Sequence, residues 1–162
     1  MENSKTFKIA IAGMIAALYV VLTWIANLLG IASGAIQVRL SEALTILPVF
    51  TVSAVPGLTV GCVLANLLTG CAAWDVVFGS LATLLGAVGT RLLKDKPLLA
   101  WIPPVVSNAA IGPIILIKVY GVPDAWWYLV LTVGAGEIIA CGILGLLLWR
   151  SLKNVPQVRN MK

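Results

Sequence analysis

Apolar runs long enough to cross a membrane follow one another along almost the whole chain. A helix needs about 20 apolar residues to span the hydrocarbon core of a bilayer. The runs predict six helices, at about residues 7–29, 41–54, 56–70, 75–91, 98–118 and 125–150. We therefore predict an all-α integral membrane protein, in which residues 1–162 form a single six-transmembrane-helix bundle.

Prolines make two of the predicted helices irregular. The second helix is short and contains Pro48, so it barely spans a membrane alone. The fifth contains Pro103-Pro104 and Gly112-Pro113. We expect this helix to bend or break there, because proline removes a helical hydrogen bond and clashes with the preceding turn.

Charged residues are few and lie mostly at the ends of the apolar runs. The chain is 60% hydrophobic and 10% charged, with a formal net charge of +5. Six helices place both termini on one side, and the positive-inside rule makes that side cytoplasmic. The basic residues then expected in the cytoplasm are Lys5, Lys8, Arg91, Lys94, Lys96, Arg150, Lys153, Arg159 and Lys162, against Arg39 and Lys118 outside. These charges form no basic face, so nucleic acid is not an expected partner.

Several kinds of catalytic site are missing from the sequence. The chain has no histidine, which excludes Ser–His and Cys–His nucleophile pairs. It has no phosphate-binding P-loop motif and no acidic cluster at metal-ligand spacing. We therefore expect a binding or transport protein rather than an enzyme, with no metal site.

The strongest candidate for chemistry is Glu137, near the middle of the last apolar run. A carboxylate at bilayer depth is costly and usually faces a bundle interior or a solvated cavity. Its helical neighbours include Gly134, Ala140 and Cys141, whose small side chains leave room for a flat ligand. The alternative is a structural carboxylate that bonds to a neighbouring polar side chain.

Four further polar residues are candidates for substrate binding. Arg39 and Glu42 flank the predicted outer entrance to the second helix, where they form either a binding mouth or a helix-start ion pair. Asn66 and Asn108 lie in apolar surroundings, where each amide can bind a ligand or a neighbouring helix.

Asp75 and the aromatic residues are weaker candidates. Asp75 fits the N-cap of the fourth helix better than a ligand contact. Trp74, like other aromatic residues at the predicted outer ends, fits the aromatic belt of a membrane interface. One of these rings, or Tyr19 or Phe50, could instead stack on a planar ligand.

The first helix carries small residues at Ala12, Gly13 and Ala16. Small side chains four residues apart let another helix approach closely. The partner helix is either in another membrane subunit or in the same chain, and spacing alone leaves both alternatives open.

Several segments of this chain resemble the queuosine-precursor transporter (QueT) family. The resemblance is carried by VRLSEALTILP at 38–48, PGLTVGCVLANL at 56–67, DVVFGSLATL at 75–84 and Gly136-Glu137. It covers nearly the whole chain in order. One departure is Val52-Ser53, where the family pattern predicts Pro-Ala.

This resemblance implies the substrate-binding S component of an energy-coupling factor (ECF) transporter in a bacterial plasma membrane. The implied partners are a transmembrane coupling subunit, docked on Ala12, Gly13 and Ala16, and two ATPase subunits that hydrolyse ATP. No cofactor is then expected on this chain. The implied substrates are deazaguanine bases, namely queuine or its cyano (preQ0) and aminomethyl (preQ1) precursors. Residues 30–37 would form a lid over the site.

The resemblance also implies roles for the polar residues. Glu137 would accept the ring N–H and the exocyclic amine of the base as a bidentate pair. Asn66 and Asn108 would read the carbonyl and pyrrole sides, and Arg39 would meet the carbonyl or orient Glu42. An aminomethyl cation would have Glu42 or Asp75 as its candidate partner.

Three alternatives remain open on the sequence. A solitary, ion-coupled carrier would use Glu137 as a proton relay. An S component for a different vitamin would keep the architecture and change the ligand. A structural subunit of a membrane complex would bind no small molecule.

Overall fold

The computed structural model describes residues 5–32 and 36–159 and is helical throughout, with no strand among these residues. In chain order, the elements are α1 (Lys5–Leu28), the 3₁₀ helix η1 (Leu40–Val49), α2 (Ala54–Leu68), α3 (Ala73–Leu92), α4 (Ile102–Lys118), α5 (Trp126–Glu137), the π-helix η2 (Ile138–Leu144), α6 (Gly145–Leu152) and α7 (Pro156–Arg159). The predicted all-α class is confirmed.

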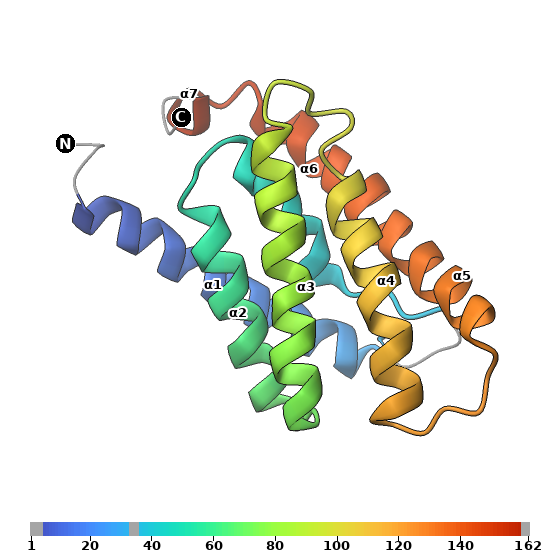
Figure 1. Cartoon of the computed structure of the whole chain (residues 1–162). Coiled ribbons are helices and arrows are strands. Elements are labelled where there is room, and N and C mark those ends of the chain that lie inside the picture. Colours follow the sequence, from blue (N-terminus) through green and yellow to red (C-terminus); the bar gives the residue numbers. More distant parts are fainter. Residues whose placement is uncertain (1–4, 33–35, 160–162) are drawn as a thin grey trace.

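Successive helices of the chain pack side by side around η1. In Figure 1, α2, α3 and α4 stand next to one another, and the continuous helix formed by α5, η2 and α6 follows α4. The 3₁₀ helix η1 lies behind α3 and contacts α1, α3, α6 and η2. Because η1 is central, its polar residues are carried into the interior of the bundle.

The distribution of polarity is that of a membrane protein. Large apolar residues are exposed on the outer surface, as at Leu28 (76% exposed) and Leu92 (78%). Polar residues are buried inside, as at Glu42 (1%) and Thr90 (0%). An apolar exterior around a polar interior suits a lipid environment, because lipid removes the penalty for exposing apolar side chains.

Three helices among the described residues are long and apolar enough to cross a membrane. They are Lys5–Leu28, Ala73–Leu92 and the combined Trp126–Leu152. The helices Leu40–Val49, Ala54–Leu68 and Ile102–Lys118 are apolar but shorter. The predicted count of six spans and the cytoplasmic placement of the termini stay predictions.

The second predicted helix differs in type and length. An α-helix was expected at 41–54, but the structure has a 3₁₀ helix that ends at Val49. Pro48 offers no N–H for a helical hydrogen bond, and its carbonyl instead accepts a hydrogen bond of 3.0 Å from Nη1 of Arg91 on α3. A 3₁₀ run of ten residues is unusually long.

The fifth predicted helix is not interrupted at Gly112-Pro113, where a bend or break was expected. It begins at Ile102 rather than at residue 98, so Pro103 and Pro104 fall in its first turn, where no intrahelical N–H is lost. The α-helix then continues through Pro113 to Lys118. The prolines therefore mark the start of α4 and do not divide it.

The last predicted helix contains a wide turn. Where 125–150 was expected as one α-helix, the structure has α5, then seven π-helical residues, then α6. The π segment begins at Ile138, directly after Glu137. Such π turns are rare and often occur at functional sites.

The small residues of α1 lie against α2. A Cβ added to Gly57 would lie 2.7 Å from the carbonyl oxygen of Ala12, and one added to Gly61 would lie 3.0 Å from the Cα of Ala16. This contact supports the intrachain alternative for Ala12 and Ala16. Gly13 is exposed, and a Cβ there would meet nothing within 4 Å. Docking of another subunit on this helix stays a prediction.

Candidate functional site

A buried cavity, here called the first chamber, lies between α3, α4, α5 and the segment before η1. The space open to the centre of a water molecule is about 60 Å³. Its wall consists of Gln37, Arg39, Asp75, Gly79, Ala82, Asn108, Ile111, Gly112, Ile115, Leu116, Tyr120, Val133 and Glu137. Charged and amide groups therefore face the same space as aliphatic side chains.

A second chamber adjoins the first and is larger, at about 350 Å³ by the same measure. It extends toward the end of the bundle where α1 and α2 end and α3 begins, and Asn27, Asn66 and Thr69 line it. Arg39, Asp75 and Tyr120 line both chambers and are called the waist below.

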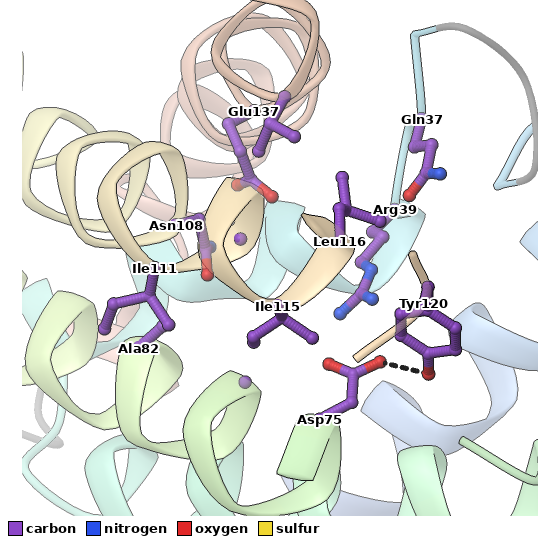
Figure 2. A pocket seen from close by; sticks show the side chains of 13 residues that line it. Gln37, Arg39, Asp75, Ala82, Asn108, Ile111, Ile115, Leu116, Tyr120 and Glu137 are labelled. Carbon is purple, nitrogen blue, oxygen red and sulfur yellow. Dashed lines mark hydrogen bonds between the residues drawn. The ribbon is translucent and has the colours of Figure 1, made fainter. Parts of the chain in front are cut away.

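Glu137 faces the first chamber, as its sequence context predicted. The residue is 6% exposed and is the last residue of α5 before the π turn. In Figure 2 its carboxylate points away from its own helix, toward the space beside Asn108. The thiol of Cys141 donates to Glu137 Oε2 at 3.3 Å. The carboxylate is thus held by this hydrogen bond at the wall of the first chamber.

Glu42 is buried beside Glu137 rather than exposed at a mouth. It is 1% exposed, and the Tyr19 hydroxyl on α1 donates a hydrogen bond to its Oε1. Its Oε2 has no hydrogen-bond partner. Carboxylate oxygens of Glu42 and Glu137 and the sulfur of Cys141 lie within 4.8 Å of one another. The two carboxylates thus belong to one site.

This cluster has ligand atoms suitable for a cation, namely two carboxylates and one thiol. A hydrogen bond already joins the thiol to Glu137. Thr45 Oγ1 donates at 2.6 Å to the main-chain oxygen of Glu42 and so orients the same turn of η1. We describe the cluster as a hydrogen-bonded network that holds the two carboxylates in place.

Arg39 precedes η1 and reaches into the waist. Figure 2 shows its guanidinium pointing toward Asp75 and Tyr120. Among the side chains drawn there, the one hydrogen bond runs from Tyr120 to Asp75, so Arg39 forms none with the other lining residues. Of the two alternatives for Arg39, an ion pair with Glu42 or a binding role, its place at the waist supports the binding role, because the guanidinium faces the cavity and Glu42 lines neither chamber.

Asn108 on α4 brings an amide to the first chamber. Its side chain is drawn between Glu137 and Ile111 in Figure 2, and its Nδ2 has no hydrogen-bond partner. A buried amide donor without a partner costs about 1–3 kcal/mol. A ligand with an acceptor at this point would recover that energy.

Asp75 is not the N-cap of α3. The helix begins at Ala73, two residues earlier than Asp75, so the carboxylate lies within the first turn. The Tyr120 hydroxyl donates to Asp75 Oδ2 at 2.9 Å and accepts the N–H of Ala72 at 3.2 Å. Burial raises the pKa of Tyr120 to about 12, so the hydroxyl keeps its proton at neutral pH.

Asn66 lies at the second chamber, and Trp74 does not line either chamber. Asn66 is 3% exposed, and its Nδ2 is 3.5 Å from the main-chain oxygen of Asp75. Trp74 is 62% exposed and stacks on Phe78 at 5.6 Å between ring centroids. Trp74 therefore fits the membrane-interface alternative. The predicted lid at 30–37 includes residues 33–35, which lie outside the described residues.

Sequence reasoning missed Tyr120, named Gln37 only as the last residue of the predicted lid, and misjudged Tyr19. Tyr19 was expected to stack on a ligand, if it took part at all, yet it binds Glu42. Gln37 and Tyr120 lie outside the regular helices, where no periodic signal marks an inward-facing residue. The one sequence feature linked to Gln37 is the glycine at position 136, because any side chain there would collide with the Gln37 carbonyl oxygen.

An apolar exterior and a polar cavity enclosed by helices define an integral membrane protein of the binding or transport class. The sequence model of the QueT transporter family matches residues 9–154. The chain belongs to this family. The predicted class of transporter rather than enzyme agrees with that membership.

A curated relative shares part of this sequence. The queuosine precursor transporter QueT of Lactococcus lactis subsp. cremoris (strain MG1363) is 40% identical over 97 residues, which are 59% of this chain and 56% of the relative. The match thus spans just over half the length of that relative. The comparison with solved structures finds no match.

Proposed function

We propose that the protein is the substrate-binding S component of an ECF-type transporter that imports a queuosine precursor across a bacterial plasma membrane. The substrate is a deazaguanine base, such as queuine or its aminomethyl or cyano precursor. The observation that carries this proposal is the first chamber, where Glu137, Asn108 and Arg39 line the same space.

The chemistry of the chamber matches the edges of such a base. A deazaguanine presents a ring N–H and an exocyclic amine side by side, and a carboxylate accepts both in a bidentate pair. Glu137 supplies that carboxylate. The base also has a carbonyl oxygen, for which Asn108 Nδ2 and the Arg39 guanidinium are the nearby donors. Ile111 and Ile115 supply apolar contacts for the ring faces.

The energy for transport would come from other subunits. The sequence has no P-loop, so ATP hydrolysis is assigned to two ATPase subunits joined through a transmembrane coupling subunit. Since Ala12 and Ala16 pack on α2, we place the docking contact of α1 on the exposed side that contains Gly13. This chain then binds the substrate, and the assembled complex moves it.

Calorimetric titration of the purified protein with deazaguanines tests the assignment. We expect saturable binding of at least one member, and binding of an unrelated vitamin from a matched panel would instead assign a different substrate. Failure to bind any small molecule of the panel would favour a structural subunit. Reconstitution in proteoliposomes should give uptake only when the coupling and ATPase subunits are added.

The role of the Glu137 carboxylate is tested by the substitution Glu137→Gln. The matched variant is Glu42→Gln. Hydrogen bonds to charged groups contribute about 1.5–3 kcal/mol each, so losing the bidentate pair should weaken binding about 100-fold or more. Glu42 does not line the first chamber and keeps an acceptor for Tyr19 as Gln, so its variant should lose about tenfold or less. Equal losses would contradict this division of roles.

The proximity of Glu42 to Glu137 also favours a second function, an ion-coupled carrier that acts alone. Two carboxylates with oxygens within 4.8 Å of each other can share a proton and pass it on. This alternative predicts uptake by the chain alone in proteoliposomes, abolished in Glu137→Gln. Binding without uptake under the same conditions would exclude it.

A further inference from the structure

The two chambers give a bound base a direction. Glu137 lines the first chamber only, whereas Asp75 at the waist faces both chambers. A deazaguanine whose donor edge lies on Glu137 therefore turns its five-membered ring, remote from that edge, toward the waist. The substituent on that ring, which distinguishes the queuosine precursors from one another, would then point toward the larger second chamber.

Asp75 offers an acceptor at this point. The residue is 7% exposed, and Tyr120 occupies only its Oδ2. Its Oδ1 lies beside Gly79, where an added Cβ would be 3.0 Å from this oxygen and 3.3 Å from Asn66 Nδ2. Gly79 itself lines the first chamber. A ligand group at the waist can thus reach Asp75 without displacing Tyr120.

Charge around the cavity favours a cationic group at the waist. Asp75 and Glu137 line the chambers, whereas Arg39, which shares the waist with Asp75, is the one cation among the described lining residues. The base edge itself is neutral. An ammonium on the substituent would balance the two carboxylates against the one guanidinium that line the chambers, and a nitrile would not.

On the basis of the proposed function, we propose that Asp75 is a specificity-determining residue that binds an ammonium group on the substituent of the base. The site then selects amine-bearing deazaguanines, such as the aminomethyl form, over the neutral cyano form. Tyr120 is a positioning residue, because it fixes Asp75 Oδ2 and leaves Oδ1 to the ligand.

The test compares aminomethyl and cyano 7-deazaguanine by calorimetric titration on the wild-type protein and on Asp75→Asn. Asn keeps the size of the side chain and removes its charge. We expect the wild type to bind the aminomethyl form at least tenfold more tightly, and Asp75→Asn to reduce that ratio to about one while leaving the cyano affinity within about threefold. Asp95→Asn, an exposed carboxylate in the loop between α3 and α4, is the matched control and should leave the ratio unchanged.

Two variants keep the result interpretable. If Asp75→Asn does not fold, Tyr120→Phe retains the charge and frees Asp75, so the amine preference should persist but fall several-fold. Two results would overturn the inference while the proposed function stands. One is equal affinity of the wild type for the cyano and aminomethyl forms. The other is a ratio of these two affinities that neither Asp75→Asn nor Tyr120→Phe changes. Absence of binding by both ligands would overturn the proposed function itself.

Discussion

Replacing Gly136 by alanine should separate the geometry of the site from its charge. Gly136 precedes Glu137, and the main chain of Gln37 lies directly against it. A Cβ at this position would be 2.1 Å from the Gln37 carbonyl oxygen, whereas real Cβ contacts essentially never fall below 3.0 Å. The Gln37 backbone must therefore retreat by about 0.9 Å (3.0 − 2.1) or more.

The expected loss of binding affinity depends on the side chains that the Gln37 segment carries. Arg39 is two residues further along and carries the guanidinium of the waist. Hydrogen bonds of this kind need donor–acceptor distances of about 2.7–3.2 Å, so a shift of nearly 1 Å breaks or badly weakens one. With about 1.5–3 kcal/mol per charged hydrogen bond, we expect Gly136→Ala to weaken deazaguanine binding by about 10- to 100-fold.

Calorimetric titration measures the effect, and Gly134→Ala is its control on the same helix. A Cβ at Gly134 would lie 3.9 Å from Ala109 Cβ, an ordinary contact, so this variant should bind as tightly as wild type. Both substitutions raise helix propensity by up to about 1 kcal/mol, which makes affinity rather than thermal stability the decisive readout. Wild-type affinity in Gly136→Ala would refute the argument that this contact positions Arg39.

Two further predictions concern stability, measured by thermal unfolding in detergent. Gly57→Ala should destabilise the bundle by about 1–3 kcal/mol, because its Cβ would lie 2.7 Å from the Ala12 carbonyl oxygen, whereas Gly13→Ala should be neutral or slightly stabilising. If Gly57→Ala is as stable as the wild type, the close contact between α1 and α2 at this position does not contribute to stability. Tyr19→Phe should cost about 1–3 kcal/mol by leaving both oxygens of buried Glu42 without a donor, and an unchanged melting temperature would contradict this.

Helix positions could be predicted from the sequence because bilayer-length apolar runs leave little choice of structure. The observed ends of α1, α2 and α3 fall within two residues of those expected. Glu137 was also found in this way, since a carboxylate in an apolar run must be accommodated inside the bundle. These are properties of single segments, which composition and spacing report directly.

Features that depend on two segments meeting could not be predicted. The burial of Glu42 requires η1 to be central, and nothing in the residues 40–49 alone distinguishes a central 3₁₀ helix from a short membrane-entry helix. The π turn after Glu137 likewise lies where η2 packs against η1. Tyr120 enters the site through its bond to Asp75, a residue that the sequence assigned to a helix cap.

Glycines fix the geometry of this site as much as its charged residues do. Gly136 leaves room for the Gln37 backbone. Gly145 directly follows the π segment as the first residue of α6, and an added Cβ there would lie 3.5 Å from the Ala43 carbonyl oxygen. The segment from Gln37 to Ala43 is therefore held against the last long helix at both ends. That segment carries Arg39 and Glu42, so the close approach at Gly136 sets how near these charges come to Glu137, and a larger residue at Gly136 would separate charges that are nearly a hundred positions apart in the sequence.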